Sequence, residues 1–283
     1  MSAVNSRKPT KLAPRQRDIY ENGKVFSIEG KLLFRCSKKR LDWYHSRGLA
    51  KYVDANSIQL NFETKGSGRA EDKFYLEDQP NRCVGCGRHD QLTLHHIVPE
   101  MYRKYMPECI KSRSSFDLLP VCTACHDGYE RFSIQYKKAL VENHSAPLEG
   151  TGWILHPEHR SVSRAASALI KNRTKIPAGR VEELESIVLN WWRQSHPESV
   201  ALDNDILNQA VELPDREKSQ HFKEHGEIVV EQLMKHAMVT EEGHERWLDL
   251  EAFIISWRKH FLQCVQPRYL SPNWSVEQSV YNR

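Results

Sequence analysis

The chain has 283 residues, of which 39% are hydrophobic and 28% charged, a length that suits one small domain together with a second. No apolar run approaches the roughly 20 residues that span a bilayer, which excludes a helical membrane protein and predicts no membrane partner. Residues 1–145 carry 25 Lys and Arg with 17 Asp and Glu, whereas residues 146–283 carry 16 and 20. A polyanion-binding surface is therefore expected in the first half, although an ordinary solvated basic face explains the charge equally well.

The N-terminal region predicts an unstructured arm followed by a hairpin. Residues 1–17 carry five basic groups and no acidic one, and they lack the apolar stretch of a secretory signal. We therefore expect residues 1–22 to form a disordered basic arm. Two short apolar runs in residues 24–34 flank the turn-forming pair Glu29 and Gly30, a pattern typical of a β-hairpin.

A helix and a strand are expected next. Ser37 stands where an N-cap is needed for a helix over residues 38–47. Ile58, Leu60 and Phe62 then alternate with polar residues. Alternation with a period of two places these three side chains on one face of an extended chain, which predicts a half-buried strand.

The second half of the chain predicts helices. A helix that begins near Cys122 places Phe132, Tyr136 and Leu140 on one apolar face. Further helical patterns, separated by prolines, are expected over residues 161–171, 178–192, 202–211, 220–238 and 244–263. We therefore expect residues 149–283 to form an all-helical region, and a surface there for a protein partner stays an open alternative.

Four of the seven cysteines form two Cys-x-x-Cys pairs, Cys83 with Cys86 and Cys122 with Cys125. Two such turns supply the four thiolates of a tetrahedral zinc site. This spacing also favours a reducing intracellular compartment, the nucleus or the cytoplasm, with the mitochondrion left open. Two other interpretations explain less: buried apolar cysteines leave the double spacing unexplained, and c-type haem attached at Cys122, Cys125 and His126 leaves the first pair without a purpose.

Two adjacent histidines, His95 and His96, lie between the cysteine pairs in a segment, residues 92–99, that has the pattern of a strand. Neighbouring side chains of a strand point to opposite faces, so the two histidines cannot both face the same core. A lone histidine is usually an ordinary structural side chain. A His-His step that begins nine residues after Cys86 and is closed by Pro99 indicates a functional site instead.

These residues make the sequence resemble the HNH endonucleases, whose ββα-metal site reads Cys-x-x-Cys, His-His or Asp-His, Asn, and Cys-x-x-Cys-His. The resemblance implies that His95 and His126 bind a catalytic cation, Mg²⁺ or Mn²⁺, and that His96 is the general base. Asp117 stands where the family has Asn, and an Asp there can hold the imidazole of His96 and raise its basicity. The combination suits phosphodiester hydrolysis, because a cation neutralises charge on the phosphate and a base deprotonates the attacking water.

Four basic residues follow the histidine strand, in a loop where the HNH family lets its substrate approach. They are Arg103, Lys104, Lys111 and Arg113. One interpretation of these side chains is that they bind phosphate groups of a nucleic acid. The other, that they are ordinary solvated charges, stays open.

Longer segments look like the C-terminal HNH-type region of eukaryotic exonuclease 3′-5′ domain-containing proteins, among them CSKKRLDWYHSRGLA, LHHIVPEMYRKYMP and FIISWRKHFLQCVQPRYLSPNW. In that family an acidic two-metal exonuclease domain precedes this region. Residues 1–80 lack its spaced set of Asp and Glu. The chain is therefore expected to be the HNH-type region alone, and the exonuclease activity is not carried over.

The sequence thus predicts an α+β protein. We expect a small zinc-stapled ββα-metal core, treble-clef-like and of HNH type, with an N-terminal hairpin and helix in residues 23–148, followed by the helical region. Its expected function is metal-dependent endonuclease cleavage of DNA or RNA, which makes it a hydrolase with nucleic acid as partner. Two alternatives stay open: a catalytically inactive module that binds nucleic acid or a protein, and a structural protein whose helical half is the functional part.

Overall fold

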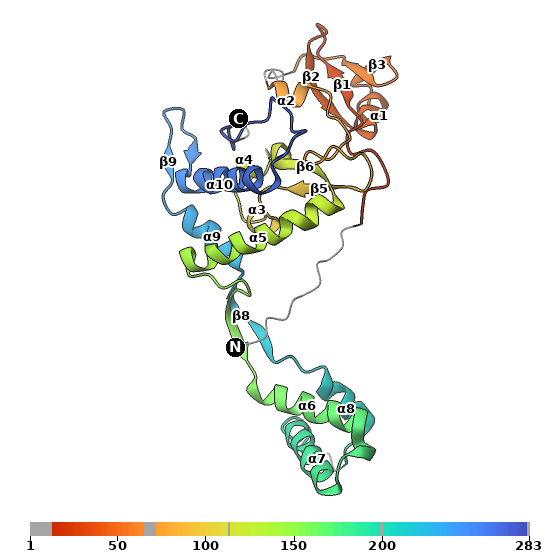
Figure 1. Ribbon diagram of the computed structural model, residues 1–283, viewed down its shortest axis with the longest axis vertical. Helices are drawn as coiled ribbons and strands as arrows, with labels where there is room; N and C mark the ends of the chain where they lie inside the picture. The colour runs from red at the N-terminus through yellow and green to blue at the C-terminus, as the bar shows by residue number, and fades with distance from the viewer. Residues whose placement is uncertain (1–12, 65–71, 113, 199–200, 282–283) are drawn as a thin grey trace. The chain divides into compact units, whose positions relative to one another are not determined.

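The computed structural model describes residues 13–64, 72–112, 114–198 and 201–281. Two compact units make up the chain: unit 1 contains Met1–Ala146 and Gly226–Arg283, and unit 2 contains Pro147–His225. The predicted α+β class is confirmed, because both units combine helices with small sheets (Figure 1). Of the expected disordered arm, residues 1–12 lie outside the described residues, and the expectation is wrong for residues 13–22, because the Arg15 N–H donates to the Leu92 carbonyl and the Tyr20 N–H to Asn81 Oδ1. Within the described part of the chain, none of the helices combines the length and the apolar character of a membrane span.

The N-terminal part of unit 1 is a four-stranded sheet in the order β2-β1-β4-β3. Its elements are β1 (Gly23–Phe26), β2 (Leu32–Cys36), α1 (Lys38–Ser46), β3 (Ala50–Asp54) and β4 (Ser57–Leu60). The predicted hairpin is confirmed, since β1 and β2 pair antiparallel and the turn uses Gly30 at φ +83°, a conformation that favours glycine. The predicted helix and strand are α1 and β4. Val25, Leu41 and Ile58 are fully buried between the sheet and α1.

The centre of unit 1 is an antiparallel pair of strands followed by a long helix. Strand β5 (Leu92–His96) pairs with β6 (Leu118–Cys122), and α5 (Thr123–His144) begins directly after β6. The connections contain α2 (Lys73–Leu76), α3 (Glu100–Arg103), α4 (Glu108–Lys111) and the 3-10 turn η1 (Ser114–Asp117). The predicted helix from Cys122 is confirmed. Of its expected apolar face, Tyr136 and Leu140 pack inward, whereas Phe132 is exposed.

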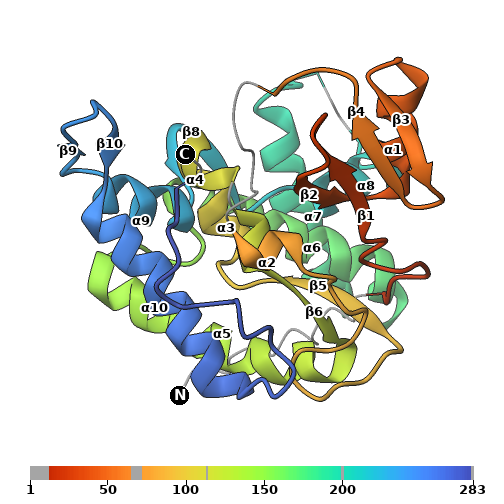
Figure 2. The same ribbon diagram turned by 90° about the horizontal axis from the view of Figure 1, so that it is seen from above.

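The last part of the chain packs onto this centre. It comprises α9 (His225–Leu233), β9 (Met238–Val239), β10 (Glu245–Arg246) and α10 (Leu248–Val265). Helix α10 lies along α5, as Figure 2 shows, and its Trp257 and Phe261 are fully buried. Beyond α10, Trp274 stacks on Phe116 with ring centroids 5.5 Å apart, and its Nε1 donates to the Phe116 carbonyl.

Unit 2 consists of a two-stranded ribbon and a group of helices. Its elements are β7 (Thr151–Leu155), α6 (Pro157–Asn172), the 3-10 turn η2 (Arg173–Lys175), α7 (Ala178–Arg193), α8 (Asn204–Val211) and β8 (Arg216–Lys223). The helices predicted over 161–171, 178–192 and 202–211 are confirmed as α6, α7 and α8. Ala166, Val188 and Ala210 are fully buried where the three helices meet.

The expectation of an all-helical region after residue 148 is wrong. Strands β7 and β8 pair antiparallel, and β8 takes the first four residues of the helix predicted over 220–238. Trp153 links the two strands, because its ring lies 4.1 Å from the guanidinium carbon of Arg216 and 4.7 Å from the Phe222 ring. Most side chains of this ribbon are exposed. It therefore lacks the apolar alternation from which a strand is predicted.

Candidate functional site

The two cysteine pairs converge beside the strand pair of unit 1. The Sγ atoms of Cys83, Cys86, Cys122 and Cys125 all lie within 4.8 Å of one another, and those of Cys86 and Cys122 are 3.7 Å apart. A tetrahedral zinc ion with Zn–S bonds of about 2.3 Å requires sulfur atoms about 3.8 Å apart. The cluster therefore fits a zinc ion, as the spacing of the cysteines predicts.

The turn that begins at Cys83 continues through Gly87, whose backbone N–H donates to the Cys83 carbonyl. Gly87 has φ +84°, and a Cβ atom there would lie 2.6 Å from the Tyr269 ring, so the turn requires glycine. The backbone N–H of Arg88 bonds to the Cys86 sulfur and lowers the pKa of its thiol to about 7. Because the thiolate is the form that binds zinc, this N–H prepares Cys86 as a ligand.

Two of the predicted site histidines meet across the strand pair and α5. His95 is buried in β5, and His126 lies in the first turn of α5. His95 Nδ1 and His126 Nε2 are 3.1 Å apart. Two nitrogen ligands of one metal ion, each at about 2.1 Å, are separated by roughly 3.0–3.4 Å. The pair therefore has the spacing of two ligands of one cation.

Thr93, which sequence reasoning missed, determines which nitrogen of His126 carries the proton. The Thr93 hydroxyl donates to the Val121 carbonyl at 2.9 Å, so it can only accept from His126 Nδ1, which is also 2.9 Å away. His126 Nδ1 is then protonated, and its Nε2 presents a lone pair to His95. The signal was present in the sequence, because strand alternation places Thr93 on the same face as His95.

Burial keeps these two rings neutral near pH 7. It lowers the pKa of His95 to about 3, with the nearby His126 and His96 adding to the effect. Burial also lowers the pKa of His126. Neutral imidazole is the form that binds metal ions, so the environment favours the binding-competent state of both side chains.

His96 points to the other face of β5 and is half-buried. Burial lowers its pKa to about 4, and the positive charge of Arg103 contributes. The Nδ1 atom of His96 is buried without a hydrogen-bond partner among the residues that the structure describes. His96 is therefore neutral and able to accept a proton, but it lies next to the His95 and His126 pair rather than within it.

Asp117 was predicted to hold the imidazole of His96, and this contact is wrong. Both carboxylate oxygens bind Arg258 of α10, which donates from Nε at 2.8 Å and from Nη2 at 2.9 Å. Their side chains are 9% and 1% exposed. Among the described residues, Arg258 is the hydrogen-bond partner of both carboxylate oxygens, and no bond joins this carboxylate to the imidazole of His96. Sequence reasoning missed Arg258. The signal was its place four residues after Ile254, on the apolar face of α10, because an arginine on a buried face almost always has an acidic partner.

The predicted phosphate-binding residues differ in their surroundings. Arg103 pairs with Glu100 at 2.7 Å, and it lies close enough to His96 to affect its pKa. Lys104 is exposed, with its ammonium 4.8 Å from the Tyr105 ring centroid. Lys111 is half-buried at the end of α4. Arg113 lies outside the described residues.

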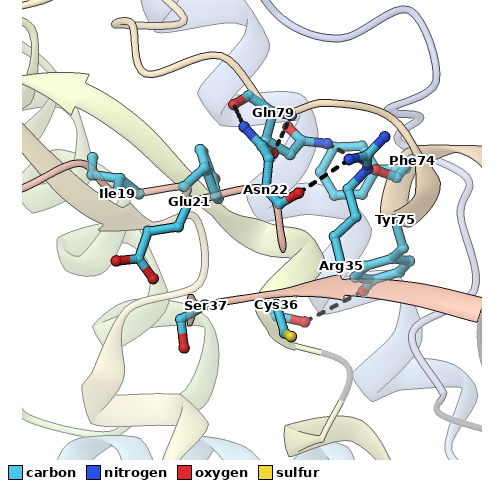
Figure 3. Close-up of a pocket in the computed structure, with 11 residues that line it drawn as sticks. Ile19, Glu21, Asn22, Arg35, Cys36, Ser37, Phe74, Tyr75 and Gln79 are labelled. Carbon is cyan, nitrogen blue, oxygen red and sulfur yellow. Dashed lines mark hydrogen bonds between the residues drawn. The ribbon is translucent and has the colours of Figure 1, made fainter. Parts of the chain in front are cut away.

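A separate pocket of about 250 Å³ lies between α2 and the N-terminal sheet. Figure 3 shows hydrogen bonds that join Asn22 to Gln79 and Arg35, whereas the Glu21 side chain points away from this group. Asn22 Nδ2 donates to the Gln79 carbonyl at 3.0 Å, and the Gln79 backbone N–H donates back to Asn22 Oδ1 at 2.9 Å. Arg35 donates to the Asn22 carbonyl at 3.3 Å. These bonds use the groups that would recognise a ligand, so the histidines remain the candidate site.

Comparisons with known proteins agree with the resemblance to exonuclease 3′-5′ domain-containing proteins. Exonuclease 3′-5′ domain-containing protein 2 of Drosophila melanogaster is 29% identical over 276 residues, 95% of this chain and 45% of that protein. The Mus musculus protein of the same name is 31% identical over 93% of this chain and 39% of its own length, and protein RRP6-like 3 of Arabidopsis thaliana is 34% identical over 59% and 21%. No family model and no solved structure matches. The chain spans less than half the length of these relatives, and its homologues are exonuclease 3′-5′ domain-containing proteins.

Proposed function

We propose that the chain is a metal-dependent nuclease with an HNH-type ββα-metal site that hydrolyses phosphodiester bonds of DNA or RNA. The four cysteines hold a structural zinc ion, His95 and His126 bind the catalytic cation, and His96 is the general base. The 3.1 Å approach of His95 Nδ1 and His126 Nε2 carries the proposal. The exonuclease 3′-5′ domain for which the fly and mouse relatives are named supports a nuclease-type function.

The chain's own residues supply binding and proton transfer. A bound cation neutralises charge on the phosphate and on the leaving oxygen. His96 accepts a proton from water while the water oxygen bonds to phosphorus and the bond from phosphorus to the sugar oxygen breaks. Arg103 adds positive charge beside His96. Because Mg²⁺ prefers oxygen ligands, two imidazoles make Mn²⁺ the better fit of the two predicted cations.

Plasmid nicking with single-histidine variants tests this proposal. Wild type with Mn²⁺ is expected to nick supercoiled DNA or to cut labelled RNA, and His96→Ala to lower the rate by about 100-fold or more, the scale of general-base catalysis. His236→Ala is the matched control, since His236 is an exposed histidine of the same unit. Zinc content and circular dichroism establish that each variant folds. Equal rates for wild type and His96→Ala would remove His96 from the mechanism.

A second candidate function is a module that binds nucleic acid without cutting it. The observation that favours it is the Asp117 carboxylate, which binds Arg258 and leaves the imidazole of His96 without a positioning group. Under this proposal the chain binds labelled single- or double-stranded oligonucleotides at low salt, and Lys104→Glu weakens binding because a phosphate contact becomes a repulsion. Binding without product in Mg²⁺, Mn²⁺ and Zn²⁺ would select this function over the nuclease.

A further inference from the structure

A second group of metal-binding side chains lies in unit 2, at the start of α6. His156 precedes the helix, Pro157 occupies its first position, and Glu158 and His159 lie in its first turn. One potential ligand atom from each of His156, Glu158 and His159 lies within 4.8 Å of the other two. The two imidazole rings stack with centroids 4.6 Å apart and an interplanar angle of 18°. These three residues are separate from every residue of the proposed nuclease site.

The outer nitrogen atom of each ring already has an acceptor. His159 Nδ1 lies 2.9 Å from the carbonyl oxygen of Pro214, which can only accept, so Nδ1 carries the proton. His156 Nε2 lies 3.4 Å from the Glu217 carboxylate, which favours a proton on that atom. The inner atoms, His156 Nδ1 and His159 Nε2, then carry lone pairs. They lie 3.7 and 4.0 Å from Glu158 Oε1. Metal-binding histidines are held by carbonyls and carboxylates in this way.

We propose that His156, Glu158 and His159 bind a divalent transition-metal ion, with Zn²⁺ the best match to two imidazoles and one carboxylate. Ligands of zinc at about 2.1 Å lie roughly 3.4 Å apart, so the Glu158 carboxylate moves inward by a few tenths of an ångström on binding. Its side chain is 56% exposed and free to do so, whereas those of His156 and His159 are 23% and 20% exposed. An ion pair of Glu158 with protonated histidines is the competing explanation, and it predicts no bound metal.

The ion would be bound by residues 156–159 alone, and it would be linked to the other end of the helical part of unit 2 through the contacts of His159 with Pro214 and of His156 with Glu217. His156 follows β7 directly. Pro214 lies between α8 and β8, and Glu217 is the second residue of β8. The site therefore connects the strand that leads into α6 with the strand that follows α8. Because the ribbon of β7 and β8 has mostly exposed side chains, a metal link at this junction stabilises it where apolar burial does not.

Zinc titration of the full chain tests the proposal. After equilibrium dialysis, the wild-type chain is expected to hold one equivalent of zinc more than the double variant His156→Gln/His159→Gln. Glu217→Ala removes the acceptor behind His156 and is expected to lower the affinity about tenfold. His221→Gln is the matched control, because His221 is an exposed histidine of the same strand β8 and is expected to match wild type. Glu158→Gln is a second variant, in which the side chain keeps its size but loses its charge. It is also expected to lack the additional equivalent of zinc.

The outcomes separate this site from the nuclease site. All of these proteins keep the four cysteines, His95 and His126, so a loss or absence of nuclease activity leaves the zinc difference unchanged. Added zinc raises the thermal unfolding midpoint of wild type more than that of the Glu158→Gln variant, with circular dichroism confirming that both fold. Equal zinc content and equal shifts in wild type and Glu158→Gln would overturn the proposal.

Discussion

Replacing Asp117 with Asn tests the buried ion pair and restores the residue of the HNH family at the same time. The side chains of Asp117 and Arg258 are 9% and 1% exposed, so the substitution leaves a guanidinium charge in the interior without its counter-charge. Removing one partner of a buried ion pair typically costs about 3–5 kcal/mol. The Asn oxygen still accepts one hydrogen bond, and Arg258 keeps its bonds to the carbonyls of Val276 and Gln278. We therefore expect the lower end of that range, about 3 kcal/mol.

Urea unfolding followed by far-UV circular dichroism measures this loss. The matched control is Glu277→Gln, which removes an exposed ion pair with Lys259, the neighbour of Arg258 on the same helix. That control is expected to cost less than about 0.5 kcal/mol. A loss below about 1 kcal/mol for Asp117→Asn would refute the reasoning, because the two charges would then be hydrated or relaxed rather than buried. Higher nicking by Asp117→Asn would show that an amide at this position serves His96.

Three further predictions concern the metal-binding residues. Thr93→Val keeps the shape of the side chain but removes the acceptor for His126 Nδ1, so calorimetry should show Mn²⁺ affinity falling about tenfold, and unchanged affinity would mean that Thr93 does not orient the ring. Cys125→Ser should lose the structural zinc in elemental analysis and the cooperative unfolding of unit 1, whereas a zinc-loaded, stable variant would contradict the four-sulfur site. In buffer without added cation, stability should fall as the pH drops from about 6.5 toward 3, because burial lowers the pKa of His95 to about 3 and the unfolded chain binds this proton more readily than the folded one. His95 alone contributes at most about 1.4 kcal/mol per pH unit, so His95→Leu should reduce the slope by up to that amount in urea titrations at pH 7, 6 and 5.

The features that the sequence predicts correctly depend on short-range spacing. A gap of two residues between Cys83 and Cys86 keeps both sulfur atoms on one turn, and the histidine that follows Cys125 lies in the first turn of α5. The contact of Asp117 with Arg258 joins residues 141 positions apart, and no periodicity connects them. The β7 and β8 ribbon escapes prediction for a similar reason, because Leu155 pairs with Arg216 and Thr151 with Lys223, and its mostly exposed side chains give no apolar alternation.

The contacts of α10 affect the roles proposed for His95 and His96 differently. Phe261 stacks on His95 with an interplanar angle of 17°, and a stacked ring covers the face of an imidazole, whereas the nitrogen lone pairs lie in the plane of the ring. His95 Nδ1 can therefore face a cation shared with His126 although the side chain is only 7% exposed. Arg258 of the same helix takes the one carboxylate that was expected to hold His96. Under the proposed function, the choice between cleavage and binding alone then depends on how His96 is oriented, and the proposed cation site is compatible with both.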